Sequence, residues 1–320
     1  MFSGSAIACD AAAVILLTDD FTKIVDAVEQ GRLIFRNLQN VIAYMIAAGC
    51  WSELLPVLAT FFLGLPTPLG SLMMIVVCVL SDTYAAVALI CELPQKSLML
   101  EKPRNLQTQP LTSYRSFLYS YLFVGNIQAL SAFYNYFIYM SHRGPLHTAP
   151  DFLPSDDYSG RSYPIGYLPS QLIGAWNWAS GSGDLATDQI SASSVGSSVY
   201  YTTLVLAQIA HFISIRRSTP YFSDAIMNTA KSAEPMWRRV WNEFIASTPP
   251  LPVTAAIIGA IITCNFWNEA TFLQSSCSTG SVPGENWGIG IGFGVIVFCC
   301  LEARKWYLLL VPTSEKYLAF

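Results

Sequence analysis

The sequence predicts an all-α polytopic membrane protein with six transmembrane helices, a short cytosolic N-terminal segment and a stalk helix that enters the membrane. Composition supports this class, because 53% of the 320 residues are hydrophobic and only 12% are charged, whereas soluble domains carry about 25% charged residues. The apolar residues are gathered in long runs, as in proteins that cross a bilayer several times. The net charge of −4 gives no reason to expect a nucleic acid partner.

The N-terminal part predicts a soluble segment that leads into one long helix. Residues 1–22 contain Asp19 and Asp20, which are a turn or helix-cap signal. Residues 23–40 lack proline and are amphipathic, so we expect them to form a rigid stalk. The opening residues have no basic region before their short apolar run, which is not the pattern of a signal peptide.

Residues 41–320 are predicted to form the transmembrane domain, because six apolar segments approach the roughly 20 residues needed for one crossing. These spans are about 41–63, 70–92, 117–140, 198–215, 250–266 and 287–303. The fifth is the weakest, since it is short and begins with prolines. Between the third and fourth spans, residues 141–197 are predicted to form a long outer loop that serves as a docking surface or a disordered excursion.

The distribution of basic residues predicts which side of the membrane each connection occupies. Every Lys and Arg falls on the side that holds both termini, except Arg143 and Arg161 in the long loop. Cytoplasmic connections carry an excess of Lys and Arg. We therefore expect both termini to be cytosolic, the 141–197 loop to be outside, and the lipid bilayer to surround the spans.

Two carboxylates lie well inside predicted spans, where a charge costs about 2.5–3.5 kcal/mol. They are Glu53 in the first span and Asp82 in the second, and the short loop 64–70 allows them to face each other. One interpretation is that each carboxylate only hydrogen-bonds a neighbouring helix, but a pair at matching depth favours an ion pathway. Pro56 is expected to break the helix and to free carbonyl groups beside Glu53 for a cation.

Other polar residues inside the spans predict contacts between helices rather than chemistry. His211 lies near the cytosolic end of the fourth span, one turn after Gln208, so a snorkelling or interhelical role is favoured for His211. Glu302 is expected to be a solvated charge. Three amides of the third span are expected to bridge helices: Asn126, Gln128 and Asn135.

The remaining chemistry-bearing residues form no soluble catalytic motif. The sequence has no Gly-rich phosphate loop, no Ser/His/Asp set and no clustered metal ligands among its three histidines. Most of its eight cysteines lie in apolar runs and are expected to pack as small residues. A disulfide between Cys264 and Cys277, outside the membrane, stays open as an alternative.

Four stretches of the chain resemble P-type cation-transporting ATPases. Residues 9–46, "CDAAAVILLTDDFTKIVDAVEQGRLIFRNLQNVIAYMI", are similar to the end of that family's phosphorylation domain and its stalk helix. Residues 101–111, "EKPRNLQTQPL", resemble the loop after the sixth family helix. Residues 125–140, "GNIQALSAFYNYFIYM", and 300–310, "CLEARKWYLLL", are similar to the sodium/potassium and proton/potassium pump branch.

The resemblance implies that residues 1–22 are a remnant of the phosphorylation domain and that the six spans are family helices five to ten. It also implies an inherited cation site. Glu53 corresponds to the fifth-helix glutamate and Asp82 to the second aspartate of the sixth-helix D-x-x-x-D pattern. The first aspartate of that pattern is Cys78 here, and Ser81 stands beside Asp82. The eighth-helix Q-x-x-D pattern reads Gln208 to His211. We expect Cys78, Ser81, Gln208 and His211 to be secondary cation-site positions.

Several family motifs are absent from the chain, which limits what it is expected to do alone. The D-K-T-G, T-G-E-S and G-D-G-x-N-D motifs do not occur, so no ATPase activity is expected of this chain by itself and no cofactor of its own. The intact family enzyme uses ATP and magnesium. Expected partners are a transported cation, monovalent or other, the N-terminal portion of a pump, and a small single-span subunit. The alternative is a non-enzymatic, pump-derived scaffold. The resemblance favours the plasma membrane over internal membranes.

Overall fold

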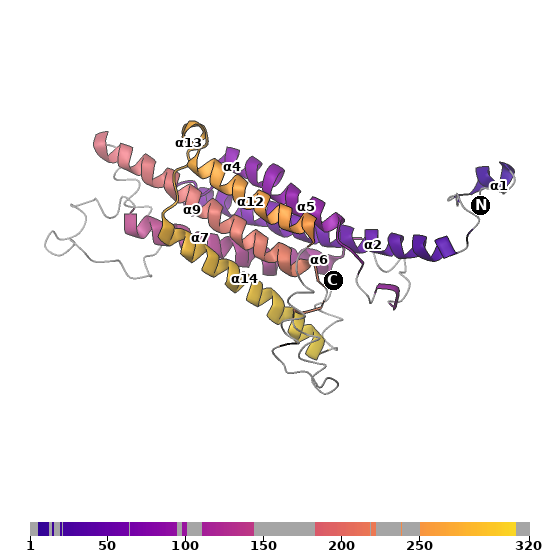
Figure 1. The fold of residues 1–320 in the computed structure, drawn as a ribbon. Helices are drawn as coiled ribbons and strands as arrows, with labels where there is room; N and C mark the ends of the chain where they lie inside the picture. The colour runs from indigo at the N-terminus through magenta and orange to yellow at the C-terminus, as the bar shows by residue number, and fades with distance from the viewer. Residues whose placement is uncertain are drawn as a thin grey trace.

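The structure is a computed structural model, and it describes residues 6–12, 15, 20, 22–63, 65–94, 98–100, 111–143, 183–217, 219–221, 238 and 250–311. Across those ranges the regular elements are helices, and no strand occurs. Long helices lie side by side in one bundle (Figure 1). The prediction of an all-α polytopic membrane protein is therefore confirmed.

The long helices follow the predicted spans in chain order. Each of the first three contains a π-helical segment. The first long helix consists of α2 (Thr22–Met45), η1 (Ile46–Trp51) and α3 (Ser52–Leu63), and the second of α4 (Ser71–Val76), η2 (Val77–Ser81) and α5 (Asp82–Ile90). The third consists of α6 (Tyr114–Leu118), η4 (Tyr119–Gly125) and α7 (Asn126–Arg143). The last three are uninterrupted: α9 (Gly183–Ile215), α12 (Leu251–Glu269) and α14 (Gly284–Leu310). The short elements are α1 (Ala6–Ala11), η3 (Leu98–Leu100) and α13 (Thr271–Cys277).

Five of these helices are long and apolar enough to cross a membrane, and they run over Thr22–Phe62, Ser71–Ile90, Ala192–Ile215, Leu251–Glu269 and Gly284–Leu310. The third predicted span, 117–140, forms its helix at the predicted place but is not among the five. The reason is composition, because Asn126, Gln128, Asn135 and several tyrosines lower its mean hydropathy.

The structure changes several predicted boundaries. Helix α9 begins at Gly183, so the end of the predicted 141–197 loop is helical, while residues 144–182 lie outside the described residues. At the N-terminus, the Thr22 N–H donates to Asp20 Oδ1 at 2.9 Å. Hydrogen bonding by the Thr22 side chain, together with this backbone bond, lowers the pKa of Asp20 below its ordinary value. Asp20 therefore caps α2, as its sequence position predicts, whereas Asp19 is not among the described residues.

Helix α9 is the centre of the bundle. In the most apolar 18-residue stretch of α9, 83% of the residues are buried, against 28–44% in the corresponding stretches of the other four spanning helices. It packs most extensively on α14 and α7, and Figure 1 shows it running between α12 and α14. Glycines allow the close approach of α14, because a Cβ atom on Gly294 would lie 3.3 Å from the Leu206 carbonyl oxygen and one on Gly290 would lie 3.1 Å from Leu206 Cδ1. Small residues commonly line such interfaces in membranes.

A polar clamp joins the three most tightly packed helices. Asn135 of α7 donates to Thr203 Oγ1 of α9 at 2.7 Å and to the Asn286 carbonyl of α14 at 3.0 Å. Asn286 Nδ2 returns a bond of 2.9 Å to Asn135 Oδ1. Asn135 is thus an interhelical bridge, as predicted. Gln128 differs, because its fully buried amide has no hydrogen-bond partner among the described residues.

The predicted cytosolic end of the bundle contains a charged network, and it corrects the expectation that Glu302 is a solvated charge. Glu302 is only 8% exposed. Its Oε1 accepts from Ser214 Oγ at 2.7 Å and from Lys305 Nζ at 2.8 Å, and its Oε2 accepts from the Tyr221 N–H at 2.9 Å. These hydrogen bonds connect α14 with the end of α9. They also satisfy the Glu302 carboxylate, which is buried in the bundle.

We predict that Gly294→Val destabilises the bundle, because the added side chain meets the Leu206 backbone of the central helix. Overpacking of this kind costs about 1–3 kcal/mol. Thermal unfolding of the detergent-solubilised protein, followed by helical circular dichroism, measures the effect. Gly292→Val is the matched control, since nothing lies within 4 Å of a Cβ atom at Gly292. Equal melting temperatures for the two variants would contradict the α9–α14 contact.

Candidate cation site

Three acidic or sulfur-bearing side chains meet between the first two helices of the bundle. They are Glu53 in the first turn of α3, Cys78 in η2 and Asp82 at the start of α5. One potential ligand atom from each lies within 4.8 Å of the others. The Cys78 thiol donates to Glu53 at 3.3 Å from Oε1 and 3.2 Å from Oε2. The structure thus brings together the two predicted carboxylates and Cys78, one of the expected secondary cation-site positions.

Both carboxylates are buried, with Asp82 0% and Glu53 8% exposed. Neither forms an ion pair with Lys or Arg in the part of the chain that the structure describes. Asp82 Oδ1 accepts from Tyr44 Oη at 3.4 Å, whereas Oδ2 has no hydrogen-bond partner among the described residues. Uncompensated carboxylates inside a membrane are costly.

Wide helical turns shape the backbone on both sides of the cluster. The π-helical segments η1 and η2 end at Trp51 and Ser81, directly before the turns that carry Glu53 and Asp82. Segments of this kind are frequent at functional sites, since they shift side chains relative to a regular helix. Trp51 fixes η1 against the third helix by donating to Asn126 Oδ1 at 2.6 Å.

Pro56 does not break the helix, which corrects the sequence expectation. Helix α3 runs from Ser52 through Pro56 to Leu63. Proline lacks the N–H that would bond the carbonyl four residues earlier, and here that carbonyl belongs to Ser52. It accepts instead from Tyr200 Oη of the central helix at 3.1 Å. The carbonyl that Pro56 releases is therefore used to join α3 to α9.

Gly49 lets the first helix approach the second at the cluster. A Cβ atom at this position would lie 3.1 Å from Asp82 Oδ2 and 3.7 Å from Cys78 Sγ. The Gly49 carbonyl oxygen also lies 3.8 Å from Cys78 Sγ. A larger residue would fill the space beside Asp82 and Cys78, so the glycine keeps that space open.

Tyr44 connects the cluster with His211. Its hydroxyl donates to Asp82, and its ring stacks on His211 with the two ring centroids 5.5 Å apart. His211 is 0% exposed, and neither ring nitrogen has a hydrogen-bond partner in the described part of the chain. His211 is thus interhelical and does not snorkel. It is not one of the three residues whose ligand atoms lie together, and Tyr44 contacts both it and Asp82.

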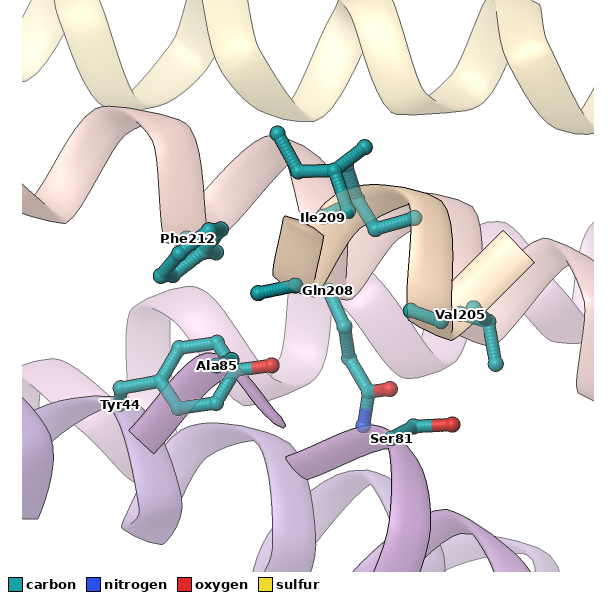
Figure 2. A pocket seen from close by; sticks show the side chains of 10 residues that line it. Tyr44, Ser81, Ala85, Val205, Gln208, Ile209 and Phe212 are labelled. Carbon is teal, nitrogen blue, oxygen red and sulfur yellow. The ribbon is translucent and has the colours of Figure 1, made fainter. Parts of the chain in front are cut away.

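Gln208 and Ser81 line a small cavity next to the cluster. Figure 2 shows the Gln208 amide reaching from the central helix toward Ser81, while Tyr44 directs its hydroxyl into the same space. The cavity has room for about one water molecule. Gln208 Nε2 donates to the Ala48 carbonyl at 3.4 Å, but its Oε1 has no partner among the described residues. Both residues therefore stand beside the ligand cluster rather than within it.

Sequence reasoning missed Tyr44, Gly49 and Tyr200. Tyr44 lies in the stalk motif, and the only signal for it was a tyrosine at the point where a polar helix becomes apolar. Gly49 and Tyr200 had no signal at all, because their importance lies in the packing of separate helices. The two cysteines considered for a disulfide, Cys264 and Cys277, are both free.

We predict that Tyr200→Phe destabilises the protein, because it leaves the buried Ser52 carbonyl without a donor. Such a loss costs about 1–3 kcal/mol. Pro56→Ala restores a backbone donor to that carbonyl, so the cost of Tyr200→Phe should shrink in its presence. The double-mutant cycle in thermal unfolding measures this coupling. Additive effects of the two substitutions would contradict the assigned role of Tyr200.

The sequence of the chain matches a known protein family. The family described as "Cation transporting ATPase, C-terminus" matches residues 66–307. The chain is 39% identical over 142 residues to potassium-transporting ATPase alpha chain 2 of Oryctolagus cuniculus, an alignment that covers 44% of this chain and 13% of that protein.

Sodium/potassium-transporting ATPase subunits give similar results. The alpha-2 subunit of Rattus norvegicus is 37% identical over 153 residues, covering 48% of this chain and 14% of the relative. The alpha-4 subunit of Homo sapiens is 37% identical over 142 residues, covering 44% and 14%. The chain thus matches only about one-seventh of the length of these relatives. The family match extends over most of the bundle and includes Cys78 and Asp82, and the chain belongs to the cation-transporting ATPases, whose C-terminal membrane region it represents.

Proposed function

We propose that this chain is the C-terminal membrane module of a P-type cation pump and supplies part of the intramembrane site for the transported cation. Glu53 and Asp82 would provide carboxylate oxygens to a dehydrated cation. The observation that carries the proposal is the burial of both groups, on adjacent helices, without an ion pair from any described Lys or Arg. A cation between the two helices would offset the cost of that burial.

Coupling to ATP hydrolysis would pass through the first helix. Residues Thr22–Leu63 form one continuous helical rod through α2, η1 and α3, so the stalk and Glu53 belong to one body. Movement of the stalk would displace Glu53 relative to Asp82 on the second helix, which changes the distance between the two ligands. Helix shifts of about 1–2 Å are sufficient in other switching proteins. ATP and magnesium would bind in other parts of the complete pump.

The proposed topology has both termini in the cytosol, as the distribution of Lys and Arg indicates. The six predicted spans agree with this topology, because an even number of antiparallel helices returns the chain to the side where it entered. Figure 1 shows α2 entering the bundle at the end where α14 leaves it. By analogy with the sodium/potassium- and potassium-transporting relatives, we place the protein in the plasma membrane. A small single-span subunit is a candidate partner.

A second candidate function is a non-enzymatic membrane scaffold derived from a pump. Cys78 and His211 favour it, because they stand where the resembled family has aspartates, so two acids of the inherited site are lost. Immunoblotting of the native protein with an antibody against its C-terminal ten residues separates the candidates. A band several-fold heavier than 35.2 kDa would support the pump, and a band of that mass would support the scaffold.

We predict that Asp82→Asn in the complete pump raises the cation concentration needed for half-maximal cation-dependent phosphorylation or dephosphorylation by at least about tenfold, or about 1.4 kcal/mol. The substitution keeps the size of the side chain and removes its charge. Measuring phosphoenzyme against cation concentration tests this. Glu285→Gln is the control, since Glu285 is exposed at the start of α14. An unchanged cation dependence in Asp82→Asn would contradict the proposed site.

A further inference from the structure

We propose that the cluster of Glu53, Cys78 and Asp82 binds a divalent transition-metal cation of the zinc class rather than Na⁺ or K⁺. As a statement about metal binding, the inference depends on these three side chains alone. As a statement about transported cargo, it rests on the function proposed above. The three groups supply two carboxylate oxygens and one sulfur, which is a mixed ligand set suited to metals of intermediate softness.

The distances fit coordination of a small cation. With bonds of about 2.0–2.3 Å, the ligand atoms of a tetrahedral zinc site lie roughly 3.3–3.7 Å apart. Cys78 Sγ already lies 3.3 Å and 3.2 Å from the two Glu53 oxygens. All three ligand groups have atoms within 4.8 Å of one another.

One carboxylate oxygen of Asp82 is an unused potential ligand at the same cluster. Asp82 is completely buried, and its Oδ2 has no hydrogen-bond partner among the described residues. That oxygen lies 3.1 Å from the position that a Cβ atom on Gly49 would occupy, and Cys78 Sγ lies 3.7 Å from it. The gap left by Gly49 is therefore bordered by a carboxylate oxygen and a sulfur. The Gly49 carbonyl, 3.8 Å from Cys78 Sγ, or a water molecule can supply a fourth ligand.

Charge and softness decide between classes of cation. Two carboxylates, and a thiol that loses its proton when the metal binds, have no ion pair with a described Lys or Arg, so one divalent ion offsets more of their charge than one monovalent ion does. Hard divalent ions such as Mg²⁺ and Ca²⁺ prefer sites made only of oxygen. Cysteine sulfur selects softer ions such as Zn²⁺. The imidazole of His211 is not counted as a metal ligand, because Tyr44 lies between it and Asp82.

Binding would exchange a proton for the metal. In the structure the Cys78 thiol donates its hydrogen to Glu53. When the metal–sulfur bond forms, the S–H bond breaks and the proton leaves to the solvent, while the metal keeps its oxidation state. Metal binding should therefore release at least one proton per ion and weaken as the pH falls.

Cobalt(II) titration of the complete protein in detergent tests the inference, because Co²⁺ substitutes for Zn²⁺ and a cobalt–thiolate bond gives a charge-transfer absorption band. We expect the band to saturate at one Co²⁺ per chain, to disappear in Cys78→Ser, and to persist in the control Cys299→Ser. Cys299 is exposed on α14, outside the ligand cluster. Asp82→Asn should raise the Co²⁺ dissociation constant by at least tenfold, and Zn²⁺ should displace the cobalt.

Three results would overturn the inference, and the first two differ in what they say of the pump. If no thiolate band forms but K⁺ or Na⁺ binds in a manner that depends on Glu53 and Asp82, the metal site is wrong and the proposed function stands. If neither a transition metal nor an alkali cation binds, both are wrong. A band that survives Cys78→Ser would assign the cobalt to another cysteine and would also overturn the site.

Discussion

The burial of two carboxylates between the first two helices is the constraint on which the rest of the site depends. Asp82 and Glu53 are almost entirely removed from solvent and have no described basic partner. Three neighbouring residues contribute to the site in different ways. Tyr44 donates one hydrogen bond to Asp82, the Cys78 thiol donates to Glu53, and Gly49 keeps the intervening space open. These contacts orient the acids without neutralising them, and in the proposed function a cation supplies the compensating charge.

The central helix holds this arrangement together. Helix α9 contacts α14 through glycines and joins α7 and α14 through the Asn135 clamp. Toward the site, Tyr200 bonds the carbonyl that Pro56 releases, and Gln208 bonds the backbone of η1. A polar residue in a membrane helix is stabilised when a neighbouring helix satisfies it. The site and the bundle are therefore stabilised by the same set of interhelical hydrogen bonds, and a substitution on α9 should affect both.

Much of the fold could be predicted, because long apolar runs and the position of Asp20 are local signals. The start of α9 at Gly183 could not, since residues 183–197 are rich in Gly, Ser and Asp and become helical before the apolar run begins. For the site, Glu53, Asp82 and Cys78 could be found, because a carboxylate in an apolar run is conspicuous and the family pattern marks the cysteine. Tyr44, Gly49 and Tyr200 depend on which helices touch, and no pattern within one helix reports that. The expectation for Pro56 was wrong because a hydroxyl from another helix satisfies the released carbonyl.

The most direct test of the account is whether a cation acts on the two buried carboxylates themselves. Infrared difference spectra of the protein, recorded with and without added Na⁺, K⁺ or Zn²⁺, report on carboxyl groups. The account predicts changes in the carboxyl stretching bands when the cation is added, with one part missing in Glu53→Gln and another part missing in Asp82→Asn. Spectra that are identical in the wild-type protein and both variants would contradict the claim that these residues bind the cation.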